Sequence, residues 1–143
     1  MKVYVVAFLM LSLVSASNQY SNLKTQVGES CVSLDNIEIL IFDVNPWPPS
    51  TFTSSFTNIV FAINQPNTSV GIIAYAIVNN LQQWTYQYQV VNQIFPQYAV
   101  ENLEYILLWP NVTGNYVAQI TFQSINSPPN INACWAFSFS IGP

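Results

Sequence analysis

The sequence predicts an all-β protein, folded as an antiparallel sandwich or small barrel of about seven strands. Several segments alternate with the two-residue period of a strand, and most segments lack the helical period of about 3.6 residues. Turn signals rich in Pro, Asn and Gly recur about every eight to twelve residues. This succession of short strands and turns predicts one sheet-rich domain.

The run at 70–78 carries the strongest strand signal. It is rich in β-branched residues and apolar at both parities, and Asn79-Asn80 ends it with a pair typical of hairpin turns. The next segment, 84–90, alternates strictly between two faces. One face carries Trp84, Tyr86, Tyr88 and Val90, and the other carries Thr85, Gln87 and Gln89. We therefore expect a central hairpin over 70–90.

Further strands are expected at 37–43, 55–63, 103–109, 115–122 and 133–141. Proline-rich breaks interrupt the chain between several of them, because proline cannot donate a hydrogen bond to a sheet. Residues 17–30 are polar and are expected to form a loose lead-in.

The N-terminal stretch has the features of a secretory signal peptide. Lys2 precedes an apolar run at 3–14, and Val14-Ser15-Ala16 has the small residues of a cleavage site. The run is too short to span a membrane as a helix. We expect cleavage after Ala16, a single domain over 17–143, and a location outside the cell or in the endosomal or lysosomal lumen.

Positive charge is almost absent from the sequence. Lys and Arg number 2 against 6 Asp and Glu, and there is no His. Nucleic acids need basic clusters that neutralise phosphates, and anionic membranes attract basic segments in the same way. We therefore expect no nucleic-acid partner, and a ligand recognised through apolar surface and neutral hydrogen bonds. We also expect a monomer.

The residues that most enzymes need are also scarce. Without His, the Ser-His-Asp and Cys-His arrangements and most zinc sites are excluded. Asp35/Glu38 and Glu101/Glu104 are each three residues apart, a spacing that places the two acids on opposite faces of a strand. The sequence thus predicts a binding protein, with no enzymatic activity, cofactor or metal.

Two cysteines and two sequons suit a secreted protein. Cys31 and Cys134 are the two cysteines of the chain, and such an isolated pair predicts a disulfide, with two unpaired buried thiols as the alternative. Asn67 and Asn111 begin Asn-X-Ser/Thr acceptors beside predicted strands. Both are expected glycosylation sites in loops outside the core.

The predicted strands carry more apolar side chains than are needed to cover the one buried face of each sheet. Three arrangements account for this surplus: a plain packed core with a few exposed aromatics, an exposed apolar sheet face that meets a partner, or an apolar cavity between the sheets. A cavity of this kind suits a lipid, because each buried methylene contributes about 0.8 kcal/mol.

A proline-rich loop, 45–49, follows the first predicted strand, and the run Leu-Trp-Pro-Asn-Val-Thr-Gly-Asn-Tyr at 108–116 opens a later one. With the terminal strand that carries Cys134, this order resembles the ML lipid-recognition domain over residues 31–142. That family includes the Niemann–Pick type C cholesterol-binding protein and phosphatidylglycerol/phosphatidylinositol transfer proteins.

The resemblance implies an immunoglobulin-like antiparallel sandwich whose sheets part to hold a sterol or phospholipid, with Cys31 paired to Cys134. It implies a lipid-binding or lipid-transfer protein, and a secreted adhesion module with an exposed apolar sheet face is the alternative. Trp47 and Phe52, on the proline-rich loop, would touch a bilayer during loading or plug the fold locally. By parity, the residues expected to line the cavity or core are Phe61, Ile63, Ile73, Tyr75, Ile77, Tyr86, Tyr88, Ile106, Leu108, Tyr116, Ile120, Phe122, Phe137 and Phe139.

Overall fold

A computed structural model describes residues 27–32, 36–51 and 53–142. The expected signal peptide at 1–16, both lysines and most of the lead-in lie outside the described residues, as do Asp35 and Phe52. Within these ranges the regular structure is entirely β, and no helix there has the length and apolar character needed to cross a membrane.

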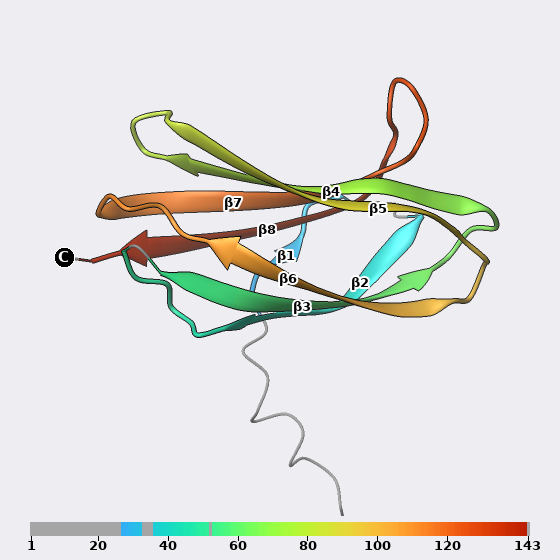
Figure 1. Cartoon of the computed structure of the whole chain (residues 1–143), viewed down its shortest axis with the longest axis horizontal. Coiled ribbons are helices and arrows are strands. Elements are labelled where there is room, and N and C mark those ends of the chain that lie inside the picture. The colour runs from blue at the N-terminus through green and yellow to red at the C-terminus, as the bar shows by residue number, and fades with distance from the viewer. Residues whose placement is uncertain (1–26, 33–35, 52, 143) are drawn as a thin grey trace, which may run out of the picture.

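The described chain forms two packed antiparallel sheets (Figure 1). The five-stranded sheet has the order β1-β8-β7-β4-β5, and the three-stranded sheet has the order β2-β3-β6. The strands are β1 (Glu29–Ser30), β2 (Ile37–Asn45), β3 (Ser54–Ile63), β4 (Thr68–Asn79), β5 (Trp84–Phe95), β6 (Val100–Leu108), β7 (Gly114–Gln123) and β8 (Ile131–Ile141).

The connections have the pattern of an immunoglobulin-like sandwich. Hairpins join β2 to β3, β4 to β5 and β7 to β8, and the remaining connections cross from one sheet to the other (Figure 1). The fold class predicted from the sequence, an antiparallel β-sandwich, is confirmed. The short strand β1 raises the number of strands among the described residues to eight, and it lies where a loose lead-in was expected.

The central hairpin is longer than predicted, and its pairing contains one irregularity. The pairing of β4 with β5 shifts between Val70 and Ile72, and Asn92 on β5 has a φ of 52°. Gly71 lies at the shift, where an added Cβ would come within 3.0 Å of the Ser124 carbonyl oxygen. A side chain at this position would therefore have to displace the neighbouring backbone slightly, which favours glycine.

Aromatic side chains from both sheets meet in the interior. Phe61 on β3 packs edge-on against Phe122 on β7, with ring centroids 5.1 Å apart. Tyr75 on β4 stacks on Tyr105 of β6 at 4.8 Å, and Phe42 on β2 contacts aromatic rings of β8. The sheets are thus in side-chain contact at several points along their length.

Trp47 plugs one end of this interior. It follows β2 and makes edge contacts with Trp109, Phe137 and Phe139 at centroid distances of 5.6 to 6.2 Å. Trp47 was expected either to touch a bilayer or to plug the fold locally. Its ring contacts are those of a local plug.

Candidate functional site: an outward aromatic face

The structure separates the predicted wall residues into two groups. Most are buried between the sheets, and these are Phe61, Ile63, Ile73, Tyr75, Ile77, Tyr116, Ile120, Phe122, Phe137 and Phe139. The structure corrects the placement of the other four, which are 50–59% exposed on the outside: Tyr86, Tyr88, Ile106 and Leu108. Their lipid-binding role stays a prediction.

The four corrected residues belong to strands at the edges of the sheets. β5 ends the five-stranded sheet and pairs with β4, and β6 ends the three-stranded sheet and pairs with β3. The inward side of an edge strand faces the seam, where the edges of the two sheets meet, as well as the core. On β5 the polar residues of the alternating pattern therefore point inward. On β6 the residues at 105–108 form a continuous apolar run, so alternation does not indicate which of them point inward.

Polar side chains close the seam between β5 and β6. The Gln87 amide donates from Nε2 to the Leu108 carbonyl and accepts from the Leu108 N–H, both at 2.9 Å. The Tyr105 hydroxyl donates to the Tyr88 carbonyl at 3.2 Å. These contacts occupy backbone groups of both edge strands, which would otherwise be free to pair with another chain.

Tyr75 connects this seam to the core. Its hydroxyl donates to Gln89 Oε1 at 3.2 Å, and Gln89 Nε2 donates to the Glu104 carbonyl at 3.3 Å. Burial raises the pKa of the Tyr75 hydroxyl far above its usual range, since a buried phenolate would lose its hydration. A hydrogen bond with Thr57 lowers this pKa and nearby Tyr105 raises it further.

The opposite side of β5 presents a row of aromatic rings to solvent. Trp84, Tyr86 and Tyr88 are 50%, 54% and 55% exposed, and Val90 continues the row. The rings of Trp84 and Tyr86 are parallel to within 9°, with centroids 5.9 Å apart. At about 3.3 Å per residue, the row from Trp84 to Val90 is about 20 Å long.

Small residues on β4 form a floor beside the aromatic row. Ala74 lies opposite Tyr88 in the β4–β5 register, and Ala76 lies opposite Tyr86. Ala74 points away from the core, yet it is only 8% exposed, because larger cross-strand neighbours flank it on both sides. The aromatic side chains thus stand along one side of a low alanine floor.

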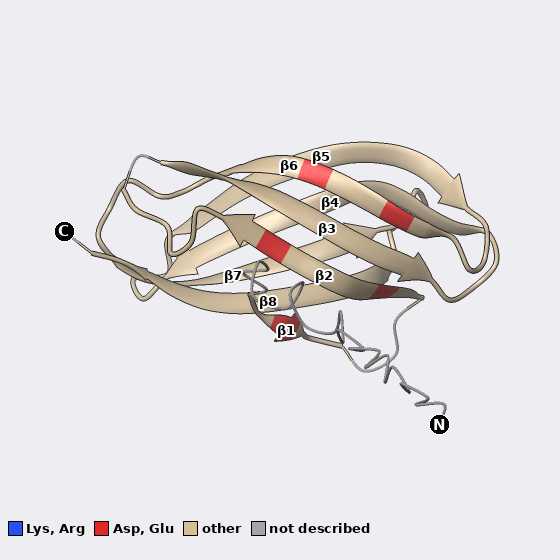
Figure 2. Ribbon diagram, turned by 90° about the horizontal axis from the view of Figure 1, so that it is seen from below, with Lys and Arg blue, Asp and Glu red and all other residues tan. Residues whose placement is uncertain are grey.

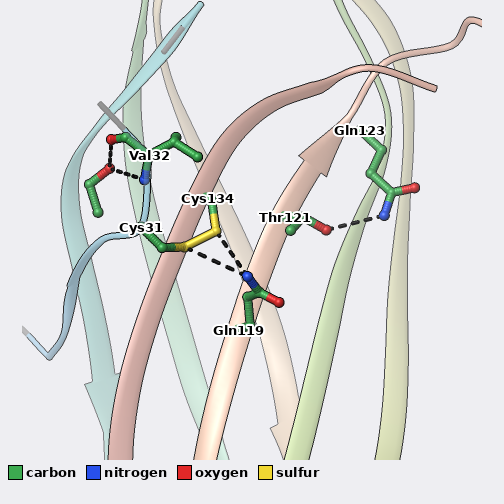
Figure 3. The surroundings of a disulfide bond; sticks show 7 residues. Cys31, Val32, Gln119, Thr121, Gln123 and Cys134 are labelled. Carbon is green, nitrogen blue, oxygen red and sulfur yellow. Dashed lines mark hydrogen bonds between the residues drawn. A yellow bond between two sulfur atoms is a disulfide. The ribbon is translucent and has the colours of Figure 1, made fainter. Parts of the chain in front are cut away.

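Amide and hydroxyl groups of β7 border the floor on its other side. Figure 3 shows these side chains, Gln119, Thr121 and Gln123, beside the disulfide. Gln119 lies opposite Ala76, and its Nε2 donates to the Cys134 sulfur at 3.4 Å. Gln123 Nε2 donates to the Thr121 hydroxyl at 3.1 Å. With both amide nitrogens engaged, the Oε1 atoms of Gln119 and Gln123 have no hydrogen-bond partner among the described residues.

We call this surface the aromatic face. It comprises Trp84, Tyr86, Tyr88 and Val90 on β5, Ile72, Ala74, Ala76 and Val78 on β4, and Val117, Gln119, Thr121 and Gln123 on β7. Sequence reasoning identified the alternation on β5. It missed the contributions of β4 and β7, because their positions beside β5 depend on sheet order.

A shallow hollow of about 500 Å³ continues the aromatic face toward the β4–β5 turn. Its rim is neutral and polar and includes Asn80, Gln82, Asn115, Ser138 and Ser140. Val78 and Val117 belong to both surfaces. A second hollow of about 420 Å³ shares Val117 and Ser138 with the first and extends to Gly28 and Glu29.

The side chain of Asn79 fixes the turn beside the hollow. Its Oδ1 accepts from the backbone N–H groups of Leu81 and Gln83 at 3.0 and 2.9 Å, and its Nδ2 donates to the Gln83 side chain at 2.8 Å. The predicted hairpin signal at Asn79 thus forms an asparagine-capped turn.

Most of the acids lie away from the aromatic face (Figure 2). Glu38, Asp43, Glu101 and Glu104 are carried by β2 and β6 of the three-stranded sheet, while Glu29 lies on β1. Within the described ranges, no group of three or more Asp, Glu, Cys or His residues is arranged to hold a metal ion.

The predicted disulfide is confirmed, and it lies beside the aromatic face. Cys31 follows β1 and bonds to Cys134 on β8, next to Gln119 (Figure 3). The two sequon asparagines, Asn67 and Asn111, are exposed in the loops before β4 and β7. Their glycosylation stays a prediction, and both positions lie off the aromatic face.

The fold and this surface define a disulfide-linked β-sandwich with a neutral, outward aromatic face. No family model matches the chain, and no curated protein matches it either.

Proposed function

We propose that this protein is an extracellular or lumenal binding module that contacts its ligand through the aromatic face. One observation carries the proposal: Trp84, Tyr86 and Tyr88 project from a single strand, and each is at least half exposed. Exposed aromatic residues that gather on one surface are typical of recognition sites, because they bury a large area at a low entropic cost.

The closed seam supports binding by the face rather than by strand addition. Gln87 occupies the Leu108 N–H and carbonyl, and Tyr105 occupies the Tyr88 carbonyl. An incoming strand would have to displace these hydrogen bonds. A ligand on the aromatic face displaces none of them.

The lipid carrier expected from the ML-domain resemblance remains a second proposal. The apolar interior favours it, since Phe61, Ile73 and Ile120 are fully buried there. The inter-sheet contacts Phe61–Phe122 and Tyr75–Tyr105 weigh against it, because a lipid between the sheets would have to separate these rings. Interior packing therefore supports the aromatic face as the binding surface.

Two triple variants test the choice of surface. The face variant carries Trp84→Ala, Tyr86→Ala and Tyr88→Ala. The control variant carries substitutions of similar exposure on the other sheet: Phe56→Ala, Ile106→Ala and Leu108→Ala.

Each protein is delipidated and presented to extracellular-matrix proteins, polysaccharides and phosphatidylcholine–cholesterol vesicles. We expect wild type to bind at least one of these, the face variant to lose about tenfold or more in affinity, and the control variant to bind like wild type. Binding to none of the panel contradicts the proposal. One-to-one lipid uptake that the face variant retains favours the lipid carrier instead.

A further inference from the structure

We infer that the ligand of the aromatic face is a neutral, linear polysaccharide. This inference rests on the proposed function and adds the chemical class of the ligand. Three features of the surface lead to it: its charge, the direction of its aromatic row, and the position of its free hydrogen-bond acceptors.

The first feature is the absence of charge from the aromatic face. The residues of the aromatic face are aromatic, aliphatic, amide or hydroxyl-bearing, and among the described residues that line either adjoining hollow, only Glu29 is charged. A charged ligand would lose hydration without gaining an opposite charge. An uncharged ligand avoids this cost.

The second feature is the linear arrangement of the aromatic side chains. A protein interface generally has an apolar centre surrounded by a polar rim, and it is enriched in Arg as well as aromatic residues. Here the apolar row follows β5, and the polar row of Gln119, Thr121 and Gln123 runs parallel to it on β7, on the other side of β4. Parallel rows of this kind fit a ligand that extends along the strands.

The third feature is the combination of ring faces and free acceptors. Sugar rings have apolar C–H faces that pack on aromatic rings, and hydroxyl groups at their edges that donate to neutral acceptors. The parallel rings of Trp84 and Tyr86 supply the apolar contact. Gln119 Oε1 and Gln123 Oε1, which lack protein partners among the described residues, supply acceptors on β7, where Gln119 lies opposite Ala76 and Gln123 lies opposite Ile72.

The hollow beside the β4–β5 turn extends the same chemistry. Asn80, Asn115 and Ser138 offer neutral donors and acceptors, and Val78 and Val117 supply an apolar base. A chain of sugars lying along β4 would continue from the aromatic row into this hollow, so a polymer would make more contacts than a single sugar.

Affinity electrophoresis tests the ligand class with polymers that share a backbone. Hydroxyethyl cellulose is neutral and carboxymethyl cellulose is anionic, while laminarin and galactomannan are neutral polymers with other linkages. We expect at least one neutral polymer to retard wild type, with little dependence on salt, because no ion pairs form. Carboxymethyl cellulose should retard it less than hydroxyethyl cellulose does.

Single substitutions test whether residues of the aromatic face cause the retardation by the polymer. Trp84→Ala should weaken binding about tenfold, and Gln119→Leu should weaken it severalfold. Phe56→Ala and Gln93→Leu, which change exposed residues off the aromatic face, should leave it unchanged. Circular dichroism and thermal melting check that every variant remains folded.

Three outcomes would overturn the inference: no retardation by any neutral polymer, stronger retardation by the anionic polymer, or retardation that survives Trp84→Ala. Binding of a protein or a vesicle that Trp84→Ala abolishes, without polysaccharide binding, overturns the ligand class and leaves the proposed function intact.

Discussion

The Gln87 side chain and the Leu108 backbone are joined by two hydrogen bonds of 2.9 Å across the seam between the sheets. The amide of Gln87 thus pairs with an edge strand much as a neighbouring strand would. The contact closes one side of the sandwich without a further strand, and it leaves the opposite side of β5 free to carry the aromatic row.

Removing this contact should open the seam. Gln87→Ala is expected to lower the free energy of unfolding by about 1–2 kcal/mol, because two hydrogen bonds are lost at a partly exposed site. Hydrogen exchange of the Leu108 amide should quicken. Gln93→Ala, an exposed glutamine on the same strand, is the matched control and should change the stability little. Unaltered exchange at Leu108 in Gln87→Ala would contradict the role assigned to this pair.

A second prediction concerns the packing between the sheets. Phe61→Ala should cost about 3–5 kcal/mol, because the ring is fully buried against Phe95 and Phe122. Phe56→Ala removes the same side chain from the same strand at a position that is 66% exposed, and it should cost far less. Urea unfolding measures both variants. Equal and small losses would mean that Phe61 borders empty space rather than packed rings.

The disulfide should stabilise the fold strongly. Cys31 and Cys134 are separated by 103 residues, and closing so long a loop reduces the entropy of the unfolded chain. Cys31→Ser with Cys134→Ser is expected to lower the free energy of unfolding by about 2–5 kcal/mol, as measured in urea. A double variant as stable as wild type would show that the bond contributes nothing to stability.

Burial of Tyr75 gives the protein a sensitivity to alkaline pH. Because burial raises the pKa of this hydroxyl in the folded state, the unfolded chain loses the proton first, above its ordinary pKa of about 10. The unfolded state then binds fewer protons than the folded state, so stability falls as the pH rises through this range, by up to about 1.4 kcal/mol per pH unit.

Tyr75→Phe provides the comparison for this pH dependence. It removes the titrating hydroxyl and keeps the ring on Tyr105, so the decline in stability above about pH 10 should be shallower. Urea unfolding at several pH values measures the slope. Parallel profiles for wild type and the variant would contradict the assignment.

The alternation of residues predicted the fold well, and it predicted the site only in part. In β3, Phe61 and Ile63 were expected to line the cavity or core, and the structure buries both of them. A strand at the centre of a sheet has one face against the core, so its apolar parity indicates the interior.

The same logic was wrong for β5, where Trp84, Tyr86 and Tyr88 form the more apolar parity and yet face outward. β5 ends its sheet, and its inward residues Gln87 and Gln89 bond to the backbone of β6. Alternation separates the two faces of a strand, but the position of the strand in the sheet decides which face is covered. Strand order arises from long-range pairing, which no local pattern encodes.

Hydroxyl-radical footprinting of the protein with and without a polymer that retards it tests the central claim most directly. Oxidation of Trp84, Tyr86 and Tyr88 should slow severalfold on binding, while oxidation of Phe56, Ile106 and Leu108 on the other sheet should not change. Equal rates at the three aromatic residues with and without ligand, or slowing confined to the other sheet, would contradict the assignment of the binding surface.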